Sequence, residues 1–324
     1  MAHADLLSPR GIEESHFRIA EHVHRTPVFR SGMLDDLLGA EILFKCENFQ
    51  KVGAFKFRGA SNATALLSPP DRAKGLATHS SGNHAQAVAL AARTYGVPAW
   101  IVMPSNSPRV KRDAVEAYGA TVIESGPRIE DREEKMEEVL AERAASFIHP
   151  YDDEGVIAGQ ATVARELLEQ VDELDAIIGP VGGGGLMSGT CLSTHYLSPK
   201  TALIGAEPSG ADDAARSLAS GTLQRNITVD TIADGLRTNL SERTFSILRS
   251  HLEEIVTVTD EEIGGALRLV YERLKLVVEP SAAVPLAAFV KVRHRLAARR
   301  IGIILSGGNV DLDRIDFSQW SSPR

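Results

Sequence analysis

The chain has 324 residues, of which 43% are hydrophobic and 24% charged, and its formal net charge is −8 at pH 7. This length predicts about two domains with sizeable cores, and the acidic balance argues against nucleic acid as a partner. Two cysteines (Cys46 and Cys191), an N-terminus without a signal pattern and no apolar run near ~18 residues predict a soluble cytoplasmic protein without disulfides or membrane spans.

Short apolar runs alternate with amphipathic segments along most of the chain. The predicted strands are 41–47, 75–80, 98–104, 120–125, 145–150, 174–180, 201–208 and 301–308. The predicted helices are 83–96, 108–119, 128–146, 157–171 and 260–276. This alternation predicts an α/β protein with mostly parallel sheets. No repeat or linker marks a domain boundary, so the sheets can be interleaved along the chain.

The stretch "ENFQKVGAFKFRGA", residues 47–60, places Lys56 between Phe55 and Phe57. Apolar surroundings disfavour the charged form of a lysine, so its pKa falls and its free amine can form a Schiff base with a carbonyl. The alternative is a lysine that extends from a short amphipathic segment into water. Taken alone, the stretch favours that alternative.

Four consecutive glycines, Gly182 to Gly185, lie between an apolar strand and an expected helix. Glycines let the backbone approach an anion closely, and the N–H groups at a helix N-terminus can bind a phosphate. The stretch matches neither the Walker loop nor the dinucleotide fingerprint. A turn with a packing role only is the alternative, but four adjacent glycines carry a large entropy cost unless the backbone itself is used.

Two further loops carry polar side chains at the ends of predicted strands. The loop "THSSGNHAQ" is suited to binding a carboxylate, although ordinary helix capping is an equal alternative. Its polar side chains are Ser80, Ser81, Asn83 and His84. Ser306, in "ILSGGNVD", follows an apolar run directly. Because ligands of open α/β sheets bind beyond the carboxyl ends of the strands, these loops predict one site. A ligand with an aldehyde for the lysine and a phosphate for the glycines is pyridoxal phosphate.

From "RTPVFRS" to "SGGNVDL" the chain resembles the serine racemase and serine/threonine dehydratase family, of the second fold type of pyridoxal-phosphate enzymes. The resemblance implies a tryptophan-synthase-β-like α/β fold with two open, twisted, mostly parallel sheets and flanking helices. It implies a large cofactor-binding domain of residues 1–69 and 151–324. A small mobile domain of residues 70–150 would close over the substrate. It also implies a homodimer.

The same resemblance implies roles for the cofactor-binding residues. Lys56 would hold the cofactor and move the α-proton on one face, with Phe55 packed nearby. Asn83 would bond the 3-hydroxyl of the ring, and Ser306 the pyridine nitrogen. The phosphate cup would consist of Gly182, Gly183, Gly184 and Gly185. A hydroxyl at the pyridine nitrogen leaves that nitrogen largely unprotonated, which weakens the electron sink and favours β-elimination.

Ser81 is matched in this family to a serine that transfers a proton on the face opposite the lysine. Racemases have this serine, many threonine dehydratases have an alanine, and dehydratases of hydroxyaspartate keep the serine. The stretch "GAFKFRGA" after "CENFQ" looks most like the 3-hydroxyaspartate dehydratases. Tyr151 stands where animal serine racemases have an asparagine, so that cofactor contact is not carried over.

Arg132 aligns with an arginine that binds the second carboxylate of dicarboxylate ligands in serine racemases. Helical periodicity alone favours a solvated arginine that pairs with Glu133 or Asp131. Arg237 and Thr238 could assist from another loop. The residues expected at the substrate are Ser80, Ser81, His84, Arg132 and Thr238.

The loop "AEPSGADD" matches the divalent-cation site of the family through Glu207, Asp213 and the backbone carbonyl of Ala211. Oxygen ligands of this kind suit Mg²⁺ or Ca²⁺. Without the resemblance, an acidic loop is usually just solvated.

We therefore expect a pyridoxal-phosphate-dependent lyase that removes water from a β-hydroxy amino acid. The sequence favours 3-hydroxyaspartate, which would give iminosuccinate or oxaloacetate and ammonia. Dehydration of L-serine or L-threonine and racemisation of serine remain alternatives. A non-catalytic protein that binds the cofactor or a phosphorylated metabolite is the alternative from another class, since it requires only the glycines.

Overall fold

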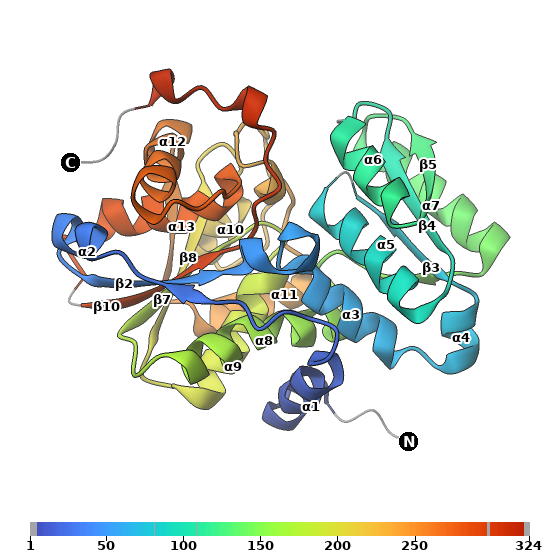
Figure 1. Ribbon diagram of the computed structural model, residues 1–324, viewed down its shortest axis with the longest axis horizontal. Coiled ribbons are helices and arrows are strands. Elements are labelled where there is room, and N and C mark those ends of the chain that lie inside the picture. The colour runs from blue at the N-terminus through green and yellow to red at the C-terminus, as the bar shows by residue number, and fades with distance from the viewer. Residues whose placement is uncertain (1–4, 81, 108, 297–298, 321–324) are drawn as a thin grey trace. The chain divides into compact units, whose positions relative to one another are not determined.

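The computed structural model describes residues 5–80, 82–107, 109–296 and 299–320 (Figure 1). The chain divides into two compact units. The small-sheet unit contains the described residues up to Val23 and from Lys56 to Gln160. The large-sheet unit contains His24–Phe55 and the described residues from Ala161 onward.

The large-sheet unit contains a six-stranded sheet in the order β1-β2-β10-β7-β8-β9. Only the β1–β2 pair is antiparallel in this sheet. The strands are β1 (Val28–Phe29), β2 (Glu41–Cys46), β7 (Ala176–Pro180), β8 (Ala202–Pro208), β9 (Glu254–Val258) and β10 (Arg300–Leu305). The helices are α2 (Gly32–Leu38), α9 (Gly185–Leu197), α10 (Asp213–Ser220), α11 (Glu242–His251), α12 (Asp260–Leu269) and α13 (Pro280–Val292).

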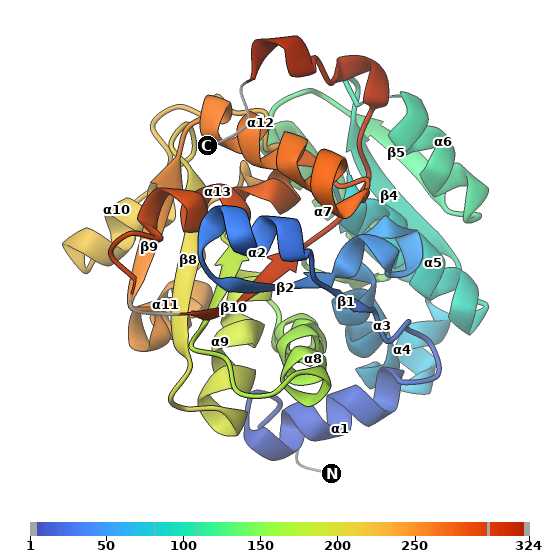
Figure 2. The same ribbon diagram turned by 60° about the vertical axis from the view of Figure 1, so that its left-hand side comes forward.

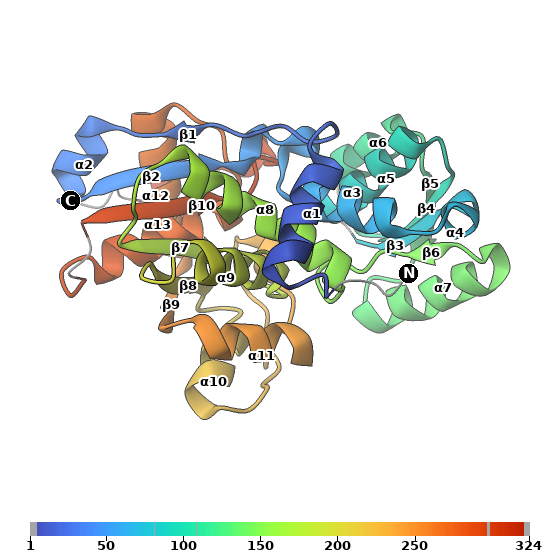
Figure 3. The same cartoon turned by 90° about the horizontal axis from the view of Figure 1, so that it is seen from below.

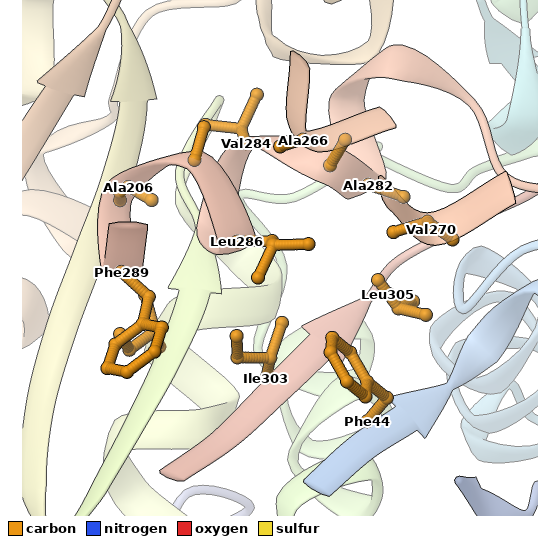
Figure 4. Close-up of a cluster of buried hydrophobic side chains, with 14 of the residues drawn as sticks. Phe44, Ala206, Ala266, Val270, Ala282, Val284, Leu286, Phe289, Ile303 and Leu305 are labelled. Carbon is orange, nitrogen blue, oxygen red and sulfur yellow. The ribbon is translucent and has the colours of Figure 1, made fainter. Parts of the chain in front are cut away.

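The residues of this sheet alternate between two apolar cores. In β2, Ile42 and Phe44 point into one core and Leu43 into the other. Figure 4 shows the first core, where Phe44, Ile303 and Leu305 meet side chains of α13. Helices α12 and α13 cover this face (Figure 1), α2 lies over β2 (Figure 2), and α9 covers the opposite face (Figure 3). Burial on both faces explains why these strands are continuous apolar runs.

The small-sheet unit contains a four-stranded parallel sheet in the order β5-β4-β3-β6. Its strands are β3 (Leu76–His79), β4 (Ala99–Pro104), β5 (Thr121–Ser125) and β6 (Ser146–Phe147). Its helices are α1 (Pro9–Ile19), α3 (Lys56–Leu66), α4 (Pro69–Ala73), α5 (Asn83–Tyr95), α6 (Arg109–Ala117) and α7 (Ile129–Arg143). Helix α8 (Glu154–Gln170) begins in this unit and ends in the large-sheet unit.

The predicted α/β class with mostly parallel sheets is confirmed. The predicted small domain, 70–150, encloses all four strands of the small sheet, and the compact unit also contains α1 and α3. Closure of a domain over the substrate stays a prediction. Within the described residues no helix is both long and apolar enough to cross a membrane.

The two predicted elements below differ most from the structure. The strand expected at 145–150 is reduced to Ser146–Phe147. The residues after it form a turn, because the hydroxyl of Thr78 binds the carbonyl of Ile148 and the side chain of His149 accepts from the backbone N–H of Asp152. The helix expected at 260–276 remains α-helical only to Leu269 and continues as a π-helical turn, Val270–Leu274. The predicted start of helix 108–119 lies at residue 108, outside the described residues.

Candidate active site

Lys56 is the first residue of α3. The side chain of Phe57 is fully buried, whereas Phe55 is half-buried against an apolar core. Lys56 itself is half-buried, and its Nζ donates a hydrogen bond of 2.7 Å to the carbonyl of Pro150. The flanking rings therefore fix the start of the helix, and the amine ends on a backbone carbonyl.

A short backbone ladder immediately precedes Lys56. The N–H of Phe55 donates to the carbonyl of Ser306 at 3.0 Å, and Ala54 pairs with Gly307 in an antiparallel bridge. Ser306 follows β10 directly and is only 3% exposed. The ladder thus ties the end of a central strand to the residue one peptide bond before Lys56.

Glu279 lies against this ladder and was not singled out by sequence reasoning. Its N–H donates to the carbonyl of Gly307 at 3.0 Å. A Cβ atom added to Gly307 would lie 2.8 Å from Oε1 of Glu279, so the carboxylate of Glu279 packs closely against the ladder. The signal in the sequence is an acidic residue directly before Pro280, which starts a largely buried helix.

The glycine loop forms the N-terminus of α9. Gly184 has a φ of 85°, and a Cβ atom there would lie 2.8 Å from side-chain carbon atoms of Leu240 and Thr244. The first N–H groups of a helix have no acceptor within it. Near them, the hydroxyl of Ser188 is buried without a partner among the described residues. Free amides and an unpartnered hydroxyl fit an anion such as a phosphate.

The loop before α5 contains the residues expected to bind a carboxylate. Ser80 accepts a hydrogen bond from the N–H of Gly82 at 3.3 Å, and Asn83 is the first residue of α5. Ser81, the predicted proton-transfer residue, lies outside the described residues.

His84 is buried, and its Nε2 lies 2.9 Å from the carbonyl of Ile148. Because a carbonyl only accepts, Nε2 carries the proton and Nδ1 is an acceptor. Burial lowers the pKa of His84 well below its usual value, and the charge of Lys56 lowers it further. The ring is neutral and bonded to the backbone, so His84 would contact a carboxylate through its main-chain N–H.

Arg132 lies on the inward face of α7, at helical spacing with the buried Met136 and Val139. Its Nε is buried without a hydrogen-bond partner among the described residues. Burial lowers the pKa of Arg132. Asp131 pairs with Arg128 at 2.7 Å. These contacts do not fit a solvated Arg132 paired with Asp131.

His79 lies at the end of β3 and interacts electrostatically with Arg132. Its ring stacks on Phe147, with centroids 5.6 Å apart. Burial lowers the pKa of His79 to about 4, and the charge of Arg132 lowers it as well. At neutral pH Arg132 therefore stands beside an uncharged imidazole.

The second loop proposed for the substrate belongs to the large-sheet unit. Arg237 donates its Nε to the carbonyl of Thr231 at 3.2 Å, and Thr238 is exposed. The guanidinium of Arg237 is therefore bonded to its own loop.

Glu207 and Asp213 are both fully buried, so this acidic loop is not simply solvated. The carboxylate of Glu207 lies at the start of α10, where it accepts hydrogen bonds from the N–H groups of Ala214 and Ala215 at 3.1 and 2.8 Å. Asp213 accepts from the side chain of Asn226 at 2.9 Å and from a backbone N–H at 2.8 Å.

The electrostatics of these carboxylates fit a cation. Burial raises the pKa of Glu207 to about 9, and the negative charge of Asp213 also raises it. Burial raises the pKa of Asp213 as well. Among the described residues no group of three or more His, Cys, Asp and Glu side chains could hold a metal. Carboxylate and carbonyl oxygens are the ligands that a hard cation prefers, so the predicted set of Glu207, Asp213 and the carbonyl of Ala211 stays a prediction.

The fold and these loops together define a class of enzyme that works with pyridoxal phosphate. The chain belongs to the pyridoxal-phosphate dependent enzyme family, whose model matches residues 19–307. The predicted family is thereby confirmed.

Individual relatives cover nearly the whole chain. This chain is 48% identical over 304 residues to a beta-hydroxyaspartate dehydratase of Paracoccus denitrificans, and the match covers 94% of this chain and 96% of that protein. It is 49% identical over 298 residues to an L-threo-3-hydroxyaspartate ammonia-lyase of Saccharomyces cerevisiae, covering 92% of this chain and 91% of that protein. The structure of maize serine racemase matches with a TM-score of 0.93 and 46% identity, over 94% of each chain.

Proposed function

We propose that this enzyme is a lyase that removes water from 3-hydroxyaspartate. The two relatives named for hydroxyaspartate support this substrate class. The observation that carries the proposal is the buried, unpartnered Nε of Arg132, on the inward face of α7. A second carboxylate on the substrate would supply the charge-assisted hydrogen bonds that this nitrogen lacks.

When bound, pyridoxal phosphate supplies an aldehyde that reacts with amines and an electron sink for negative charge at the α-carbon of the substrate. Lys56 would hold the cofactor, and its amine would take the α-proton. The N–H groups of Gly182–Gly185 and the start of α9 would bind the phosphate. Asn83 and Ser306 would bond the 3-hydroxyl and the pyridine nitrogen.

The α-carboxylate of the substrate would bind to the N-terminus of α5, where Ser80 and the main-chain N–H of His84 lie. Ser81 would face the substrate opposite the lysine. The α-hydrogen and the β-hydroxyl leave together as one molecule of water. The enamine product then tautomerises to iminosuccinate, which water hydrolyses to oxaloacetate and ammonia.

A coupled assay for keto acid tests the substrate. We expect one stereoisomer of 3-hydroxyaspartate to give a higher kcat/KM than L-serine or L-threonine. A higher kcat/KM for serine or threonine would contradict the dicarboxylate proposal. Racemisation of serine is the competing activity, because the chain is 46% identical to maize serine racemase. Chiral analysis of serine in the same reactions measures it.

Replacing Arg132 with alanine should lower kcat/KM for 3-hydroxyaspartate by about a hundredfold, because a bidentate ion pair is lost. The kcat/KM for threonine should change less than about threefold, since threonine has no second carboxylate. Arg128→Ala is the matched control, because Arg128 lies at the start of the same helix with 72% of its side chain exposed. Equal losses of kcat/KM for both substrates would show that Arg132 does not bind the second carboxylate.

We further propose that Mg²⁺ or Ca²⁺ binds Glu207, Asp213 and the carbonyl of Ala211. At a hundred times its Kd, the cation should raise the free energy of unfolding by about 2.7 kcal/mol. Glu207→Gln should abolish this increase in a thermal shift assay at pH 7.5. The control is Asp212→Asn, at a half-exposed residue that pairs with Arg216 at 2.8 Å. An unchanged increase in the Glu207 variant would place the cation elsewhere.

We also propose that the enzyme is a homodimer, as the family resemblance implies. Among the large apolar side chains exposed on the large-sheet unit, four come from one short segment of the chain: Phe29, Met33, Leu37 and Phe49. The rings of Phe29 and Phe49 touch, with centroids 5.8 Å apart. Exposed apolar clusters mark interfaces. Light scattering should give twice the chain mass of 34.9 kDa, and a mass near 34.9 kDa would contradict the proposal.

A further inference from the structure

The turn at residues 148–152 of the small-sheet unit is unusually well anchored at its first residue. The N–H of Ile148 donates to the carbonyl of Ala77 at 2.9 Å. The carbonyl of Ile148 accepts two bonds, from the hydroxyl of Thr78 at 2.8 Å and from Nε2 of His84 at 2.9 Å. Both donors are buried. Since a carbonyl oxygen has two lone pairs, the orientation of this peptide group is fixed on both sides.

The other end of the turn is fixed by His149. Its Nδ1 accepts bonds from the N–H groups of Tyr151 and Asp152, at 3.2 and 2.7 Å. This pattern resembles a turn closed by an asparagine or aspartate side chain on its own following backbone. The ring of His149 also packs edge-on against Tyr151, with centroids 4.7 Å apart. Nδ1 acts as an acceptor, so the turn requires an imidazole that is unprotonated at this atom.

Pro150 lies between these two fixed points. Its ring restricts φ, and its carbonyl shares one planar peptide group with the N–H of Tyr151, so the bond from that N–H to His149 also orients the carbonyl. This carbonyl accepts the hydrogen bond from Nζ of Lys56 at 2.7 Å. A backbone acceptor held by five other hydrogen bonds thus meets the one side chain on which the proposed chemistry depends.

We propose that the carbonyl of Pro150 is a holding site for the amine of Lys56 whenever that amine is not covalently bound to the cofactor. His149 and His84 are the positioning residues of this site. A free lysine side chain loses rotamer entropy when it is ordered. The holding site orders the amine beforehand, so that reaction with an aldehyde starts from a restricted geometry. The purpose of the holding site rests on the proposed function.

Two substitutions at one position test this proposal. His149→Ala removes the acceptor that closes the turn. His149→Asn replaces Nδ1 with an amide oxygen, which can accept from the same two N–H groups. We expect cofactor-free His149→Ala protein to acquire pyridoxal phosphate at Lys56 about tenfold more slowly. The attachment is followed over time by hydride trapping and peptide mass spectrometry. The asparagine variant should stay within about threefold of the wild type.

Two further readouts separate positioning from general damage. Hydrogen exchange of the amides at Tyr151 and Asp152 should accelerate in the alanine variant and recover in the asparagine variant. In the holoenzyme, His149→Ala should lower kcat while KM changes little. The control is His22→Ala, because this ring packs edge-on against Tyr95 at 5.5 Å in the same unit and does not contribute to the turn.

Unchanged attachment and kcat in His149→Ala would overturn the proposal, as would an asparagine variant as slow as the alanine variant. If the alanine variant does not fold, Thr78→Val serves instead, because it removes one donor to the carbonyl of Ile148. This variant should also acquire the cofactor more slowly, and attachment at the wild-type rate would overturn the proposal. A wild-type protein that never forms an adduct at Lys56 refutes the proposed function instead. The two failures are therefore distinguishable.

Discussion

Replacing Lys56 with alanine should abolish covalent attachment of pyridoxal phosphate and lower kcat/KM by a thousandfold or more. The reason is that one amine both anchors the cofactor and moves the α-proton in the proposed reaction. Hydride reduction of the purified enzyme, followed by peptide mass spectrometry, should locate a pyridoxyl group on Lys56 in the wild type. The variant should carry no such group.

Lys74→Ala is the matched control, because Lys74 is an exposed lysine of the same unit that pairs with Asp71 at 2.9 Å. This variant should keep the adduct and the wild-type kcat/KM. An adduct on a lysine other than Lys56 would refute the proposed site. An adduct on Lys56 without turnover of any β-hydroxy amino acid would favour the non-catalytic binding protein.

Apolar periodicity predicted much of the fold because strands and helices depend on neighbours close in sequence. The strand expected at 98–104 is observed at Ala99–Pro104, and the helix expected at 83–96 at Asn83–Tyr95, ended by Gly96 with a φ of 65°. The glycine loop also has a local signal, since four glycines between a strand and a helix leave few other structural roles.

Contacts between distant parts of the chain had no local signal. Lys56 and Pro150 are 94 residues apart in the sequence, so the holding carbonyl could not be found from "GAFKFRGA". The pairing of Phe55 with Ser306 is equally remote. The burial of Glu207 is a tertiary property, and without the family resemblance its acidic loop predicts only a solvated segment.

Arg132 is an intermediate case. Its sequence neighbours include acidic residues, and this favoured an exposed ion pair on the helix surface. The spacing of Arg132, Met136 and Val139 nevertheless places all three on one face, and this face is the buried one. The apolar periodicity already contained this information, because a charged residue on the apolar face of a helix indicates either a partner or a ligand.

A buried ion pair that the sequence did not reveal lies in the large-sheet unit. Lys45, on β2, and Glu166, on α8, are 0% and 2% exposed, and their charged atoms lie 2.8 Å apart. The ammonium of Lys45 also donates to the carbonyl of Thr26 at 2.9 Å and to the side chain of Gln170 at 2.8 Å. All three N–H groups of the ammonium therefore have an acceptor, which is the condition for a charge to be tolerated at this depth.

Lys45→Met should lower the free energy of unfolding by about 3–5 kcal/mol, because Glu166 loses the opposite charge that compensates for its burial. The double variant Lys45→Met/Glu166→Leu should recover most of this loss, since an apolar pair of similar volume needs no compensation. Urea unfolding of the holoenzyme measures both effects. The control is Lys291→Met, which breaks a largely exposed pair with Glu262 and should change stability by less than about 1 kcal/mol. If the single Lys45 variant were no less stable than this control, the ion pair would contribute nothing beyond a surface contact. A double variant less stable than the single one would mean that Glu166 stabilises the unit through its other bonds.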